Sequence, residues 1–142
     1  MRLHHWAVGG DQGWQDVGAL PPYYLDNLPG VLDVGRGSPN WGVFYEHTQL
    51  PARFHDAFIV CDYLWKSATD GNYSTSGRLV TFFLRRDNAG WKASVETLAR
   101  PRLGARDADG KPINFALVDV TVAPDGSLYV SEHNQGVVAH RL

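Results

Sequence analysis

The last 24 residues, DVTVAPDGSLYVSEHNQGVVAHRL (Asp119 to Leu142), constrain the fold more than any other part of the chain. They hold three short runs, DVTVA, SLYVSE and VVAHRL, in which apolar and polar residues alternate with the period of a half-buried strand. Two turn sequences, PDG and HNQG, separate the runs, and Pro, Asp, Asn and Gly are the residues that tight turns favour. Three antiparallel strands joined by tight turns form a meander, which is most of one blade of a β-propeller.

Composition agrees with an all-β chain that has a hydrophobic core. The chain has 142 residues, of which 44% are apolar, and 15 Gly and 8 Pro supply many turns. A net charge of −2 gives no electrostatic reason to expect nucleic acid as a partner. No apolar run approaches the length of a membrane span, and the first residues lack the apolar core of a signal peptide, which leaves the localisation unknown. The single cysteine, Cys61, lies in the apolar run AFIVC and is predicted to be a core thiol.

The middle of the chain predicts a complete four-stranded blade. Strands are expected where β-branched and aromatic residues cluster between turn signals, and the run AFIVCDY should be buried on both faces. DNAG, from Asp87 to Gly90, is a hairpin turn. The four predicted strands are Asn40–Glu46, Ala57–Tyr63, Gly77–Arg86 and Trp91–Leu98.

The pattern divides the chain into four segments. The run RLHHWAV near the start is expected to be one strand at the end of a preceding blade. The segments are the end of a preceding blade and a connector (1–37), a complete blade with an enlarged loop at 66–77 (38–98), a polar connector (99–115) and a three-stranded closing blade (116–142). One full blade and two partial ones cannot close a ring. The chain is therefore predicted to be the C-terminal part of a longer propeller or to assemble from several copies.

Several motifs, taken in order, resemble a known family. They are GGDQGW, SPNWGVFYE, LPARFHDAFIVCDY, GRLVTFFL and DVTVAPDGSLYVSEHNQGVV. From about Gly9 to Leu142 the chain resembles the C-terminal third of glucose/sorbosone dehydrogenase-type propellers, and especially the membrane-bound-dehydrogenase-like subgroup, whose propellers are joined to haem-c modules. The resemblance implies a six-bladed propeller, usually exported. It also implies sugar oxidation by pyrroloquinoline quinone (PQQ) held beside a calcium ion. Three copies of this chain, each supplying about two blades, would close such a ring.

The family's catalytic groups are not carried by this chain. In the sugar oxidases the catalytic His base and the calcium-binding loop lie in earlier blades. A lysine usually follows the strand equivalent to AFIVC, but Asp62 stands there and Lys66 comes several residues later. Ala116 and Val118 occupy the positions of two arginines that would bind the quinone's carboxylates. We therefore expect no catalytic residue and no cofactor in this chain alone, with PQQ and calcium implied by the family only.

Five residues are predicted to face the funnel on the axis of such a ring. Asn40 and Trp41 precede one innermost strand, Asn114 and Asp119 flank the other, and Asp62 ends a buried strand. Each carboxylate also has a structural interpretation. In that interpretation, Asp62 accepts hydrogen bonds from backbone N–H groups at a strand end, and Asp119 anchors the blade turn.

Trp65 and Tyr73, in the polar loop, are candidates for a surface contact with carbohydrate or a protein partner, although aromatic residues also pack between blades. No histidine pair has the spacing of a compact zinc site, so no metal site is predicted.

Two functional hypotheses follow. Either the chain is the C-terminal segment of a sugar dehydrogenase-like propeller that is not catalytic by itself, or it is a non-catalytic propeller module that binds carbohydrate or a protein partner. Self-association or the remaining blades of a longer chain would supply its structural partners.

Overall fold

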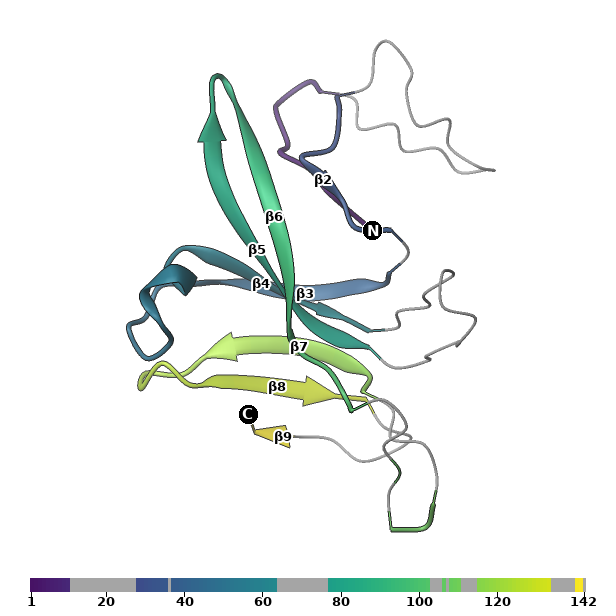
Figure 1. Cartoon of the computed structure of the whole chain (residues 1–142). Coiled ribbons are helices and arrows are strands. Elements are labelled where there is room, and N and C mark those ends of the chain that lie inside the picture. Colours follow the sequence, from purple (N-terminus) through teal and green to yellow (C-terminus); the bar gives the residue numbers. More distant parts are fainter. Residues whose placement is uncertain are drawn as a thin grey trace, which may run out of the picture.

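The chain folds into antiparallel β-sheets (Figure 1). The computed structural model describes residues 1–10, 28–35, 37–63, 77–102, 106, 108–110, 115–133 and 140–141. Within these ranges there are a two-stranded, a four-stranded and a three-stranded sheet, and they do not close into a ring. The elements are β1 (Arg2–Leu3), β2 (Leu32–Asp33), β3 (Pro39–Tyr45), the short 3-10 helix η1 (Ala52–Phe54), β4 (Ala57–Asp62), β5 (Arg78–Asp87), β6 (Gly90–Ala99), β7 (Leu117–Val122), β8 (Leu128–Glu132) and β9 (His140–Arg141).

The four-stranded sheet is a simple meander in the order β3-β4-β5-β6. Its strands begin and end within two residues of the predicted ranges. The predicted hairpin turn is confirmed, because β5 ends at Asp87 and β6 begins at Gly90, with Asn88 in the left-handed region at φ 53°. Strand β4 is buried along nearly its whole length, as its apolar run predicts.

The three-stranded sheet has the order β7-β8-β9. The predicted PDG turn joins β7 to β8, and the Ala123 backbone N–H donates to the Ser127 carbonyl across it (2.9 Å). The turn needs the glycine, because Gly126 has φ +83° and a side chain there would collide with His47. Strand β9 is short and pairs with Tyr129 and Val130 of β8.

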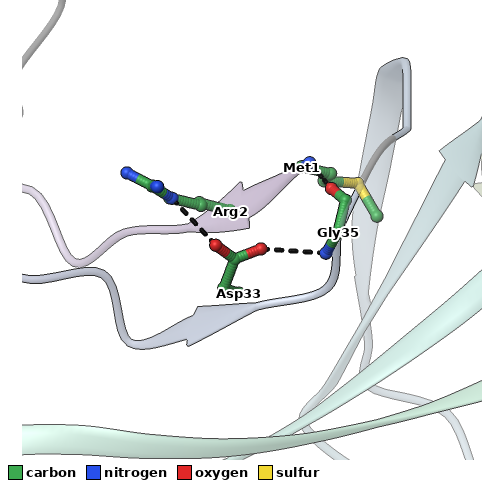
Figure 2. A network of polar contacts seen from close by, with 4 residues as sticks. All are labelled: Met1, Arg2, Asp33 and Gly35. Carbon is green, nitrogen blue, oxygen red and sulfur yellow. Dashed lines mark hydrogen bonds and ion pairs between the residues drawn. The ribbon is translucent and has the colours of Figure 1, made fainter. Parts of the chain in front are cut away.

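The N-terminal strand is much shorter than predicted. Of the run RLHHWAV only Arg2 and Leu3 form a strand, and they pair with β2. Figure 2 shows the polar contacts that hold this pair: Arg2 Nε lies 3.0 Å from Asp33 Oδ2, the Gly35 N–H donates to Asp33 Oδ1, and the Met1 ammonium group donates to the Gly35 carbonyl. The Gly35 hydrogen bond and then the Arg2 hydrogen bond hold the pKa of Asp33 below its usual value.

The main core lies between the four-stranded sheet and the three-stranded sheet. Strands β7 and β8 lie below β3 and β4 in Figure 1, and β7 contacts both β3 and β4. Side chains from the facing sides of the two sheets are excluded from solvent. They include Tyr45, Ile59, Cys61, Leu79, Leu117, Val120, Leu128 and Val130.

The opposite face of the four-stranded sheet carries a second, smaller core. Val60, Val80 and Phe82 are buried there. The residues that cover them come from the N-terminal strand pair and its flanks, namely Met1, Leu3, Leu32 and Val34. The four-stranded sheet is therefore a middle layer with a partner on each face.

A buried tyrosine ties the two large sheets together at the end where the PDG turn lies. The Tyr45 hydroxyl donates to the Gly126 carbonyl (2.9 Å) and accepts a hydrogen bond from the Leu50 N–H (2.9 Å). Tyr45 is fully buried, so these bonds form in a solvent-free environment.

Candidate functional site

The sequence-predicted site residues that the structure describes gather at the other end of the two sheets, where β3 and β7 begin and β4 and β8 end. Backbone and side-chain hydrogen bonds cross between the sheets here. Asn40 Nδ2 donates to the Leu117 carbonyl (3.1 Å), and the Tyr63 hydroxyl lies 3.3 Å from His133 Nδ1. We call this region the β3–β7 end, defined by Ser38, Asn40, Trp41, Asp62, Tyr63, Leu117, Asp119 and His133.

Asp62 is the most constrained polar group of the β3–β7 end. Its side chain is 0% exposed, Oδ1 accepts the Ser38 N–H (2.7 Å), and Oδ2 lies 3.1 Å from Arg78 Nε. Gly37 allows this approach, because a Cβ atom there would lie 2.8 Å from Asp62 Oδ1. Both carboxylate oxygens are therefore engaged by the protein itself, as the structural interpretation of Asp62 anticipates.

Backbone bulges shape the two first strands at this end. The β3–β4 register shifts between Pro39 and Gly42, and the β7–β8 register shifts between Leu117 and Asp119. A bulge adds a residue to one strand and re-aims the side chains around it. Trp41, inside the first bulge, is 61% exposed.

Asp119 lies at the second bulge, opposite Ser131 of β8, and its side chain is exposed. Its charge acts on Cys61, whose thiol has its pKa raised to about 12, first by burial and second by the negative charge of Asp119. Asp119 thus contributes an exposed negative charge to the β3–β7 end.

Three of the predicted residues, Asn114, Trp65 and Tyr73, lie outside the described residues. Asn40, Trp41, Asp62 and Asp119 belong to the β3–β7 end, but only Trp41, Asn40 and Asp119 are exposed.

Sequence reasoning missed Arg78, Tyr63 and His133. Arg78 gives a weak signal, since it is a charged residue directly before the mostly apolar run LVTFFL. Tyr63 and His133 are 70 residues apart, and no local pattern connects them.

The residues at this end do not fit the carboxylates of PQQ. Ala116 is buried and apolar, and Val118 is 38% exposed and apolar, so neither can donate a charge-assisted hydrogen bond. Asp62 is itself a carboxylate, and the nearby cation of Arg78 is paired with it. Among the described residues no group of three or more His, Cys, Asp and Glu side chains could hold a metal ion.

Comparison with known proteins adds no relative: no family model, no curated protein and no solved structure matches the chain. The part of the chain that the structure describes contains no helix long and apolar enough to cross a membrane. The likeness to sugar dehydrogenases therefore stays a hypothesis based on sequence motifs.

Proposed function

We propose that the chain forms successive blades of a β-propeller of the glucose/sorbosone dehydrogenase type, as a wall segment that does not oxidise sugar by itself. One observation carries the proposal. Two up-and-down antiparallel sheets, consecutive in the chain, pack face to face with their first strands, β3 and β7, in contact. Neighbouring blades of a propeller have this relation, because each blade starts at the axis and packs on the next.

The chemistry of the β3–β7 end supports the non-catalytic part of the proposal. The exposed groups there include an indole, an amide and a carboxylate, from Trp41, Asn40 and Asp119, and the imidazole of His133. The carboxylate of Asp119 would repel the carboxylates of the quinone, and Ala116 and Val118 offer no cation to offset it.

The direct test is a dye-reduction assay with the purified protein. The protein is mixed with PQQ, calcium, an aldose and a redox dye, and the rate is compared with the same mixture containing heat-denatured protein. We expect the two rates to be equal. Saturable turnover above the denatured control would contradict the proposal.

A second candidate, a carbohydrate-binding module, is favoured by Trp41. An aromatic side chain that is 61% exposed on a strand, next to a side-chain amide, offers a flat face and a polar group to a sugar ring. Titration with simple aldoses, followed by tryptophan fluorescence, tests this function. A saturable change that is lost in Trp41→Ala and retained in Trp91→Phe would favour binding, whereas no change would exclude these sugars.

A further inference from the structure

The two faces of the four-stranded sheet are covered unequally. On the face toward β7 and β8, the side chains of β3 and β4 reach exposures of 0%, as at Tyr45 and Ile59. On the other face β1 and β2 cover Val60, Val80 and Phe82, but Phe44 of β3 is 50% exposed. Phe44 lies on β3, the strand farthest from β6 in the sheet order.

Phe44 is the exposed end of a row of aromatic side chains that crosses the sheet. Phe44, Phe58 and Phe82 are direct cross-strand neighbours, with ring centroids 4.8 Å apart for the first pair and 6.4 Å for the second. Gly42 lets the Phe58 ring lie over β3, because a Cβ atom there would be 2.8 Å from that ring. We call Phe44 and Phe58, with the backbone of Gly42, the Phe44 strip. It continues the interface that Phe82 already makes with the N-terminal strand pair.

The edge strand that carries the strip has no charged residue. The sequence of β3 is PNWGVFY, whereas the opposite edge strand, β6, carries Lys92 and Glu96, which are held in ion pairs. Because β3 has no charged side chain, covering the Phe44 strip buries no charge from this strand.

The outer face of the three-stranded sheet is also uncovered. Tyr129 is 45% exposed, its cross-strand neighbour Thr121 is exposed, and the exposed carboxylate of Asp119 lies two residues from Thr121 on the same face. The inner face of the same sheet packs on β3 and β4 through Leu117 and Val120. On one side of the middle layer, the three-stranded sheet packs on β3. A sheet of the same kind on the other side would cover the Phe44 strip.

We propose that a second copy of this chain covers the Phe44 strip with the outer face of its β7–β9 sheet. The copies then associate head to tail, and β1 and β2 of one copy extend the three-stranded sheet of the next. The strand numbers are complementary, since within the described residues one sheet has two strands and the other has three. This inference rests on the proposed propeller, and three copies would close the six-bladed ring.

The two surfaces are different, so the contact is heterologous. Such contacts form a closed ring when the rotation between copies permits, whereas a two-fold dimer would place the Phe44 strip against itself. The two arrangements therefore predict different cross-links.

The first experiment measures the native mass of the full chain by light scattering on a sizing column. We expect a trimer. Phe44→Lys, at a half-exposed site, should give a monomer with an unchanged circular dichroism spectrum. Val95→Lys is the matched control, because Val95 lies on the same face and in the same cross-strand row but at the β6 edge, and it should stay trimeric. A wild-type monomer, or equal masses for both variants, would overturn the proposal.

The second experiment traps the contact and does not depend on Phe44→Lys. Cys61 is the single cysteine and is fully buried, so an introduced surface cysteine is the accessible thiol of the chain. A mixture of Phe44→Cys and Tyr129→Cys proteins should form a disulfide between copies on mild oxidation, and neither protein should do so alone. Cross-linking of Phe44→Cys with itself would show a two-fold contact and overturn the head-to-tail arrangement.

Mass and turnover are separate readouts. A monomer without dye reduction would remove the self-assembly inference and leave the proposed function standing. A trimer that turns over sugar would support the self-assembly inference and contradict the proposed non-catalytic function.

Discussion

Asp62 and Thr81 are both fully buried polar residues of the four-stranded sheet, but they differ in their hydrogen bonding. Asp62 has a backbone donor and an arginine within hydrogen-bond distance. The Thr81 hydroxyl has no hydrogen-bond partner among the residues that the structure describes. An unpaired buried hydroxyl costs about 1–3 kcal/mol relative to a paired one. At the residue scale, then, Asp62 supports the fold and the Thr81 hydroxyl weakens it.

Thr81→Val should stabilise the protein by about 1 kcal/mol, because valine keeps the shape of threonine and removes the unpaired hydroxyl. Urea unfolding at neutral pH measures the change. Thr81→Ser is the control, since it keeps the hydroxyl and loses the methyl group, and it should destabilise. A less stable Thr81→Val protein would mean that the hydroxyl is paired in solution.

Cys61 predicts a pH dependence of stability. Its thiol has a pKa raised from 9.0 to about 12 in the folded protein, so the folded state keeps the proton that the unfolded state loses. The stability contribution is complete below the unfolded pKa and is lost as the pH rises from about 9 to about 12, by about 1.4 kcal/mol per pH unit. The Cys61→Ala protein has no thiol, so its stability does not fall for this reason as the pH rises. The stability difference between wild type and Cys61→Ala should therefore narrow between pH 8 and pH 10, as measured by urea unfolding. An unchanged difference would contradict the raised pKa.

At the element scale, the strands that the sequence predicted well are those with five or more residues of regular alternation, or a continuous apolar run. The pattern of β4 and the turn at Asn88 are local, so they can be read without knowledge of the rest of the chain. The β1–β2 pair could not be predicted in this way. Each strand has only two residues, which is too short for a pattern of alternation. Leu3 and Leu32 pair because both pack on the same face of the four-stranded sheet.

The candidate site was predicted less completely than the strands, for the same reason. Asn40 and Asp62 could be placed at strand ends from local patterns. Their partners, the Leu117 carbonyl and Arg78, follow from how the strands and sheets pack, and the pairing of Tyr63 with His133 has no local signal.

Gly42→Ala should destabilise the protein by about 1–3 kcal/mol, the usual cost of overpacking. The new methyl group would lie 2.8 Å from the Phe58 ring and 2.9 Å from Val60 Cγ2. Thermal unfolding measures the loss. Gly90→Ala is the control in the same sheet, because the nearest atom there is an ordinary 3.7 Å away, and its stability should hardly change. Equal effects in both variants would show that the Phe44 strip is loosely packed.

At the scale of the whole molecule, the Tyr45 hydroxyl joins the two large sheets. Tyr45→Phe leaves the Gly126 carbonyl and the Leu50 N–H without this partner, which should cost about 2 kcal/mol. Amide hydrogen exchange should quicken at the β7–β8 turn more than in the β5–β6 hairpin. Ser94→Ala, which removes a hydroxyl at an exposed residue of β6, serves as the control and should leave exchange unchanged. Uniform acceleration over both hairpins would mean that the sheets separate only on global unfolding.

The placement of the first strand also sets the order in which the protein can fold. The β5–β6 hairpin is local and closes over a two-residue turn, so little loop entropy opposes it. Strands β1 and β2 instead rest on Val60, Val80 and Phe82, which are made later in synthesis. Strands β1 and β2 are therefore synthesised before the surface on which they pack. During synthesis their apolar residues stay exposed until β4 and β5 have formed.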